Sequence, residues 1–221
     1  MRVDKLVAKT QELNWYKRIT DECKREYPID LMEDIEEDEL VIDAGCNVGG
    51  FTNAYKERFH NILPIDASSY NIEEYKKNHN TDAIHKALWS RDGEILKLKK
   101  FIGPNDDETN SGNFGVMAVD RGNGVGWIGD EYEEVETITL ETLLADIDEV
   151  GLLKLDIEGA EWEFLYGKDL SKIKYITMEL HNFLGEQKKD LMQWIETTHK
   201  EIYTDGDGEE THYTKAWKRI L

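Results

Sequence analysis

Residues 41–51 read VIDAGCNVGGF, a short apolar run followed by a glycine-rich turn and the first residues of a helix. An apolar run of this length is typical of a strand that is buried on both faces of a parallel sheet. Glycine lets the backbone adopt positive φ and approach a ligand closely, and the N-terminus of the next helix presents free N–H groups. The stretch predicts a strand–turn–helix unit that binds a nucleotide-like ligand. The structural alternative is a tight turn without a ligand.

The next strand supplies an acid that fits such a ligand. Asp66 ends the segment LPID a little over 20 residues after Asp43, and acids placed at strand ends in this way bind ribose hydroxyls. The turn reads G-x-N-x-G-G from Gly45 and not G-x-G-x-x-G, so the dinucleotide fingerprint in its phosphate-binding form is absent. We expect Asp66 to accept hydrogen bonds from a ribose diol, although an acid at a strand end can also be a helix cap or a solvated group.

Apolar runs and helical patterns alternate along the rest of the chain, which favours βαβ units and a parallel sheet. We expect strands at Leu40–Ile42, Ile62–Ile65, Ala83–Trp89, Glu136–Thr139, Leu152–Ile157 and Tyr175–Leu180, and helices at Ile72–Lys77, Leu140–Ile147 and Glu161–Tyr166. The glycine-rich segment Gly103–Asp130 is predicted to be a long loop that borders the site. Near the end, Ile202–Tyr203 and His212–Ile220 flank two Asp-Gly pairs, which predicts an antiparallel hairpin.

With 221 residues and 25.7 kDa, the chain has the length of one domain. Trp15, Ile19 and Cys23 recur at four-residue steps, which predicts an N-terminal helix or a pair of helices between Asp4 and Tyr27. We divide the chain into an N-terminal helical extension, residues 1–38, and a ligand-binding domain, residues 39–221.

The net charge of -20 and the pI of about 4.7 repel nucleic-acid backbones and anionic lipid surfaces, so we expect neither as a partner. No run of apolar residues is long enough to span a membrane, and the first residues carry charges where a signal peptide is apolar. The expected location is the cytoplasm. Two cysteines, Cys23 and Cys46, are too few for a disulfide framework or a zinc site. The oligomeric state stays open.

A second group of acids follows the apolar run at Leu152. Asp156 and Glu158 come at its C-terminal edge, which is where ligands bind in open α/β sheets. Asp156 interrupts a run that should be buried, so its carboxylate needs a partner: Lys154, a backbone donor, a metal or a substrate. For Glu158 and Glu161 the structural alternative is an acid favoured by a helix N-terminus.

Glu179 and His181 end the following strand. A histidine beside carboxylates can act as a general base near neutral pH, although a histidine at a strand end is often a hydrogen-bonded structural residue. Together with Asp156 and Glu158, these residues could bind Mg²⁺ or Mn²⁺. Nothing in their spacing demands a metal, and we predict no metal site.

Three motifs resemble the FkbM-type family of S-adenosylmethionine-dependent methyltransferases: DAGCNVGGFT from Asp43, KLDIEGAEWEFL from Lys154 and MELHNF from Met178. The likeness spans Glu39–Phe183. It implies a Rossmann-like class I methyltransferase fold, with a mostly parallel seven-stranded sheet and a C-terminal antiparallel hairpin. It also implies transfer of a methyl group from S-adenosylmethionine to a hydroxyl of a small molecule or sugar.

The resemblance assigns cofactor contacts as well. It implies that the methionine part of the cofactor lies at Asp43, Gly45, Asn47 and Gly49, the ribose at Asp66 and Ala67, and the adenine near Ala87. The family usually has glutamate and proline where this chain has Asp66 and Ala67, so the ribose contact that the resemblance implies would come from a shorter side chain.

Methyl transfer to a hydroxyl requires a base that takes the proton, and the candidate catalytic residues are His181, Asp156 and Glu158. Two other functions compete with this interpretation. One is a nicotinamide-dependent oxidoreductase, which the glycine spacing disfavours. The other is a noncatalytic ligand-binding relative of the same fold, which the presence of the glycine turn and Asp66 disfavours.

Overall fold

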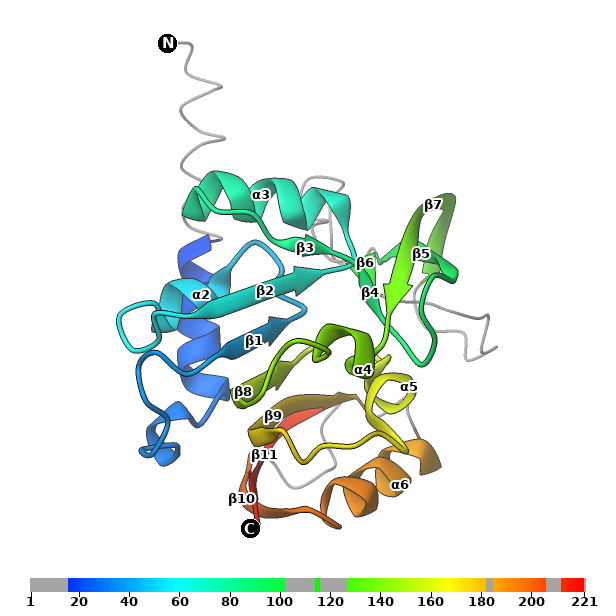
Figure 1. The fold of residues 1–221 in the computed structure, drawn as a ribbon. Coiled ribbons are helices and arrows are strands. Elements are labelled where there is room, and N and C mark those ends of the chain that lie inside the picture. Colours follow the sequence, from blue (N-terminus) through cyan, green and yellow to red (C-terminus); the bar gives the residue numbers. More distant parts are fainter. Residues whose placement is uncertain (1–15, 102–113, 116–126, 182–184, 206–211, 221) are drawn as a thin grey trace.

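A computed structural model of the chain describes residues 16–101, 114–115, 127–181, 185–205 and 212–220 (Figure 1). Its main feature is a seven-stranded sheet with the strand order β10-β11-β9-β8-β1-β2-β3. Only β11 runs antiparallel to its neighbours within this sheet; the other described pairings are parallel. The strands are β1 (Val41–Ala44), β2 (Ile62–Asp66), β3 (Ile84–His85), β8 (Val150–Leu155), β9 (Ile173–His181), β10 (His199–Thr204) and β11 (His212–Arg219). The mostly parallel seven-stranded sheet and its C-terminal antiparallel hairpin are thus confirmed.

Helices cover both faces of the sheet (Figure 1). They are a helix at residues 16–26, the 3-10 turn η1 (Ile29–Leu31), α2 (Gly50–Tyr55), α3 (Ser69–His79), α4 (Leu140–Leu143), α5 (Glu161–Leu165) and α6 (Glu186–Ile195). Adjacent strand residues face opposite sides, so β1 buries Val41 in one core with Phe51 and Tyr27, and Ile42 in a second core with Phe164 and Ile195. The apolar runs are continuous because both faces are covered.

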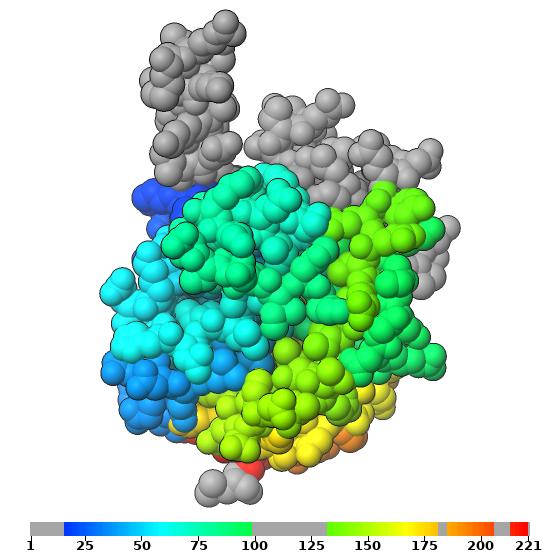
Figure 2. Space-filling view, turned by 45° about the horizontal axis from the view of Figure 1, so that its top comes forward, coloured from blue at the N-terminus to red at the C-terminus, as the bar shows by residue number. Residues whose placement is uncertain are grey.

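A second, four-stranded sheet is inserted after β3, with the order β4-β7-β5-β6. Its strands are β4 (Ala87–Leu88), β5 (Ile95–Phe101), β6 (Phe114–Gly115) and β7 (Trp127–Ile138). In Figure 2 residues 132–138, in light green, lie along one side of the molecule. β5 and β7 pair antiparallel, with Ile95 opposite Glu136.

This sheet corrects two predictions. The expected strand Ala83–Trp89 is divided between the two sheets, because β3 pairs with β2 whereas β4 pairs with β7. The expected strand Glu136–Thr139 is the end of β7, which has no place in the parallel sheet. The predicted loop Gly103–Asp130 overlaps the start of β7, and most of it lies outside the described residues.

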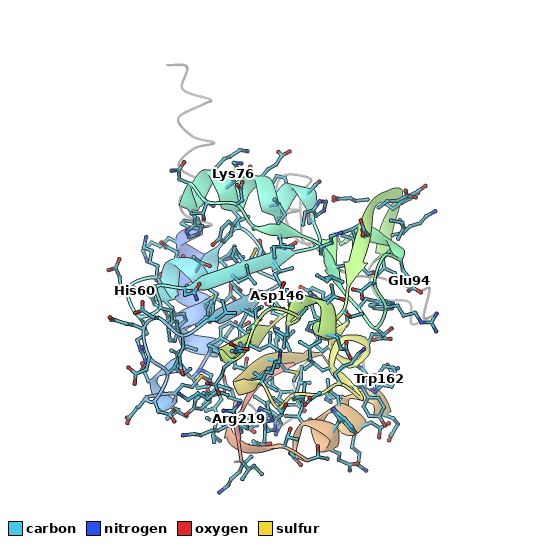
Figure 3. The ribbon with its side chains drawn as sticks, in the orientation of Figure 1. His60, Lys76, Glu94, Asp146, Trp162 and Arg219 are labelled. Atoms are coloured by element: carbon cyan, nitrogen blue, oxygen red, sulfur yellow. The ribbon has the colours of Figure 1, made fainter. Side chains whose placement is uncertain are left out.

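The segment that contains β5, β6 and most of β7 begins and ends at one place. Glu94 and Thr137 face each other there: Thr137 N donates to Glu94 O at 2.9 Å, and Glu94 N donates to Thr137 Oγ1 at 2.9 Å. Next to them, Asp92 accepts from Thr139 N at 2.8 Å and from Thr142 Oγ1 at 2.7 Å, which fixes the start of α4. Figure 3 shows Glu94 beside the second sheet. Hydrogen bonds close the insertion at its base.

None of the helices in the described part of the chain is long and apolar enough to cross a lipid bilayer.

Candidate functional site

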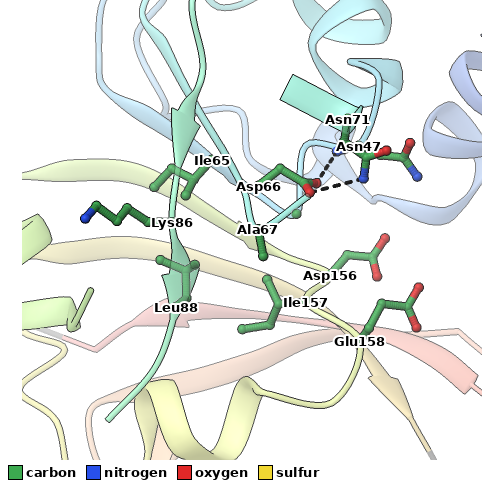
Figure 4. Close-up of a pocket in the computed structure, with 11 residues that line it drawn as sticks. Asn47, Ile65, Asp66, Ala67, Asn71, Lys86, Leu88, Asp156, Ile157 and Glu158 are labelled. Carbon is green, nitrogen blue, oxygen red and sulfur yellow. Dashed lines mark hydrogen bonds between the residues drawn. The ribbon is translucent and has the colours of Figure 1, made fainter. Parts of the chain in front are cut away.

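A pocket opens at the carboxyl ends of β1, β2 and β8, the edge where open α/β sheets bind ligands. The space at this edge is about 550 Å³ when the open solvent at its mouth is included. Figure 4 shows Lys86 and Leu88 at one end, Asp156 and Glu158 at the other, and Asp66 between them. The lining residues are Gly45, Asn47, Ile65, Asp66, Ala67, Asn71, Lys86, Leu88, Asp156, Ile157 and Glu158.

The glycine turn forms one wall of the pocket. The backbone N–H groups of Gly45 and Cys46 both donate to Ile65 O, at 2.9 and 3.0 Å, so the turn is attached to the end of β2. Gly45 has φ +74°, and a Cβ at this position would lie 1.7 Å from Asp156 O. Glycine is needed here because no side chain fits between the turn and the loop after β8.

Asp66, the residue that the sequence assigns to a ribose, connects the glycine turn to the start of α3. Its Oδ2 accepts from Asn47 N at 2.8 Å, and its Oδ1 accepts from Ser68 N at 2.8 Å and from Asn71 Nδ2 at 3.1 Å. Burial raises the pKa of Asp66, although these three donors lower it. A carboxylate has about four lone-pair positions, so Asp66 retains one for a ligand hydroxyl while it holds the turn against the start of α3.

Lys154 is the partner that Asp156 was expected to need. Its Nζ lies 4.0 Å from Asp156 Oδ2 and 3.2 Å from Asp43 Oδ1. It also donates to Gly45 O at 2.8 Å. Burial alone lowers the pKa of Lys154, but the carboxylates of Asp43 and Asp156 raise it above its ordinary value. One buried cation therefore joins the strand ends of β1 and β8 to the glycine turn.

The N-terminal segment reaches the same acids. Tyr27 is buried, and its hydroxyl donates to Asp156 Oδ2 at 3.4 Å. Burial raises the pKa of Glu26 to about 7, and the nearby carboxylates of Glu22 and Asp156 contribute to this rise. Tyr27 and Glu26 were not among the residues predicted from the sequence, since an aromatic and an acid in an amphipathic helix have no distinguishing signal.

Two pocket residues have an unusual backbone conformation. Asn47 and Glu158 have φ values of 49° and 54°, in the left-handed region that residues other than glycine seldom adopt. Such conformations cluster at ligand sites, where the surrounding structure maintains them. Both residues line the pocket, on opposite sides of the backbone contact between Gly45 and Asp156.

Six of the predicted site residues line this one pocket: Gly45, Asn47, Asp66, Ala67, Asp156 and Glu158. Asp43 lies behind it, paired with Lys154 and accepting from Thr52 Oγ1 at 3.1 Å. Gly49 lies against His79 of α3. His181 ends β9, but its side chain lies outside the described residues. The individual roles of all these residues stay predictions.

Ala87, which the sequence predicts to lie near the adenine, is in β4 at the other end of the pocket. Ala87 is buried against Leu98 and Val135, whereas its neighbours Lys86 and Leu88 line the pocket. Alternate side chains of a strand point to opposite sides, so the side chains of residues 86 and 88 face the pocket while that of Ala87 faces the second sheet. Asn71, in the first turn of α3, was also missed because its pocket position depends on how α3 follows Asp66.

Among the described residues, no group of three or more His, Cys, Asp or Glu side chains is arranged to hold a metal ion.

Comparisons with known proteins agree with this geometry. The family model of the methyltransferase FkbM domain matches residues 43–204. A protein named methyltransferase 1, from Beauveria bassiana (strain ARSEF 2860), is 27% identical over 152 residues, which cover 60% of this chain and 59% of that protein. The chain thus spans less than two thirds of the length of this relative.

Solved structures with a similar course of the chain include an rRNA methylase from Streptococcus thermophilus, with 9% identity, a TM-score of 0.47 and coverage of 86% of this chain and 92% of that one. Another is a methyltransferase from Entamoeba histolytica, with 11% identity, a TM-score of 0.47 and coverage of 83% of this chain and 54% of that one.

Proposed function

Because the chain belongs to the FkbM methyltransferase domain family, we propose that it transfers the methyl group of S-adenosylmethionine to a hydroxyl of a small molecule or sugar. The observation that carries the proposal is the single pocket in which the glycine turn, Asp66 and the acids after β8 meet. The nicotinamide-dependent oxidoreductase and the noncatalytic relative are not favoured by the family match, and we do not retain them.

The residues along the pocket fit the parts of the cofactor in order. Leu88 and Lys86 border the space for an adenine, and Asp66 has a lone-pair position for a ribose hydroxyl. At Gly45 the absence of a side chain leaves the turn in contact with the loop that carries Asp156. A sulfonium cation at that end would lie near the carboxylates of Asp156 and Glu158, and opposite charges attract more strongly where water is excluded.

The cofactor supplies a methyl group that its sulfonium charge already activates. The protein therefore has to align the acceptor with the methyl carbon and exclude water. It must also take the proton of the acceptor hydroxyl as the new bond forms. Asp156 is our first candidate for this base, since 29% of its side chain is exposed while Lys154 and Tyr27 contact its Oδ2 from the buried side. Glu158 and His181 are the alternatives.

The charge near the pocket supports a neutral acceptor over a polyanion. Asp156 and Glu158 line the pocket, Glu26 lies near them, and the whole chain carries a charge of -20. A nucleic-acid backbone would be repelled by this field. A sugar or another small molecule with a free hydroxyl meets no such barrier.

Titration calorimetry with S-adenosylmethionine and S-adenosylhomocysteine, with NAD and NADP as controls, is the first test. We expect micromolar affinity for the first pair alone. A screen of hydroxyl acceptors with radioactive methyl donor then tests methyl transfer. A folded protein that binds neither of the first pair would refute the proposal.

A further inference from the structure

The N-terminal segment provides a residue that orients the candidate base. We propose that Tyr27, which lies outside the matched family domain, is a positioning residue whose hydroxyl holds the carboxylate of Asp156 toward the transferable methyl group. This inference rests on the proposed function, since it assumes that the sulfonium end of the cofactor lies at Gly45 and Asp156.

The contact itself is specific. Tyr27 is 3% exposed, and its hydroxyl donates to Asp156 Oδ2 at 3.4 Å. Hydrogen bonds of catalytic groups are often long in ligand-free structures and shorten when substrate binds. Lys154 Nζ lies 4.0 Å from the same oxygen. Tyr27 and Lys154 thus both act on Oδ2 from the buried side, which leaves Oδ1 for a ligand.

The ring of Tyr27 is held independently of its hydroxyl. It packs edge-on against Phe51 of α2, with 5.5 Å between the ring centroids. Lys154 Nζ lies 5.6 Å from the centroid of the Tyr27 ring. Its backbone N donates to Cys23 O at 3.2 Å, and its backbone O accepts from Ile29 N at 2.9 Å and from Tyr55 OH at 3.3 Å. Loss of the hydroxyl should therefore leave the position of the ring unchanged.

Titratable groups from three parts of the chain surround Tyr27 and Asp156. Glu26 and Cys23 approach from the N-terminal segment, Glu179 from β9 and Lys154 from β8. Lys154 lies closer to Asp43, at 3.2 Å, than to Asp156, at 4.0 Å. The Tyr27 hydroxyl therefore adds a neutral donor that fixes Oδ2 of Asp156 on the buried side.

The test compares two probes in the full-length chain: S-adenosylhomocysteine and sinefungin, which carries a CH–NH₃⁺ group in place of the methylsulfonium. The ammonium of sinefungin should bind the Asp156 carboxylate. Asp156→Asn should therefore lower the affinity for sinefungin relative to S-adenosylhomocysteine by about tenfold or more. We call the affinity for sinefungin divided by the affinity for S-adenosylhomocysteine the probe ratio. Tyr27→Phe should lower this ratio by about threefold to tenfold, with the affinity for S-adenosylhomocysteine within about twofold of wild type.

The matched control is Tyr175→Phe, because Tyr175 is also buried and its hydroxyl also donates to an aspartate, Asp34, near the opposite end of the sheet. This variant should leave the ratio unchanged. In the Asp156→Asn background, Tyr27→Phe should have no further effect on the ratio.

Three results would overturn the inference. The first is an unchanged or increased ratio in folded Tyr27→Phe. The second is a Tyr27→Phe protein that does not fold, which would give the hydroxyl a structural role. The third is a wild-type protein that binds neither probe, which would refute the proposed function as well; binding of both probes with an unchanged ratio would leave the proposed function standing.

Discussion

Gly45 and Asp156 touch through their backbones, and a Cβ on Gly45 would lie 1.7 Å from Asp156 O. This contact therefore fixes the distance between the glycine turn and the loop after β8. Any side chain at position 45 has to move the two pocket walls apart.

Gly45→Ala should abolish measurable binding of S-adenosylhomocysteine and lower the thermal transition, because both the positive φ and the overlap with Asp156 oppose the methyl group. Gly93→Ala is the matched control: Gly93 has φ +71°, but no atom lies within 4 Å of the position that its methyl group would take. It should show only the backbone strain, about 1 kcal/mol. Equal losses of stability and binding in the two variants would contradict this prediction.

Asp66→Ala should weaken the binding of S-adenosylhomocysteine by about 1–3 kcal/mol, the range for hydrogen bonds to a charged group. Part of the loss is indirect, since Asp66 also holds Asn47 and Ser68 in place. Asp92→Ala removes an aspartate that likewise accepts from backbone and side-chain donors, but away from the pocket lining. Calorimetry should find its affinity unchanged, and an unaltered affinity in folded Asp66→Ala would show that the ribose role is wrong.

Lys154→Met should lower the free energy of unfolding by about 3–5 kcal/mol, because Asp43 would remain as an uncompensated buried charge. Lys154 and Asp43 are 2% and 0% exposed. The double variant Asp43→Asn with Lys154→Met removes both charges and should recover part of this loss. Urea unfolding measures both, and a double variant that is less stable than the single one would show that the pair itself provides the stability.

Glu26 should make stability depend on pH. Burial and the carboxylate of Glu22 raise its pKa from 4.5 to about 7 in the folded protein. Between these two values the folded state keeps a proton that the unfolded chain releases. The stability that this proton provides is therefore complete below about pH 4.5 and is lost as the pH rises through about 7. Glu26→Gln cannot titrate.

Relative to wild type, Glu26→Gln should therefore gain about 1 kcal/mol in the free energy of unfolding between about pH 5 and pH 8, after allowance for solvent screening of a half-buried group. Glu57→Gln, which removes an exposed acid, is the matched control. The prediction fails if the two differences from wild type run in parallel across this pH range.

The sequence predicted the parallel sheet well because its strands are buried on both faces. Val41 and Ile42 face different cores, yet both must be apolar, so a short apolar run before a glycine turn indicates β1 directly. The C-terminal hairpin was equally clear, since two Asp-Gly pairs lie between its strands in the sequence. Those signals are local, and local signals can be recognised in a single sequence.

The second sheet and α6 were missed for the opposite reason. β5 alternates lysine with apolar residues, and it can be recognised as a strand only from its pairing with β7, in which Ile95 lies opposite Glu136. α6 buries only Leu191 and Ile195, a stripe too narrow to stand out. Tyr27 was missed in the same way, because its role depends on a contact with Asp156 across 129 positions of sequence.

The hydrogen bonds between Glu94 and Thr137 at the base of the second sheet have an evolutionary consequence. An inserted segment whose two ends are hydrogen-bonded to each other can become longer, become shorter or be replaced without changing the register of β1, β2 and β8. Lineages could diversify this appendage while they inherit the cofactor pocket unchanged. For protein engineering, the segment that runs from Glu94 to Thr137 is the natural place for inserting a foreign domain into this enzyme.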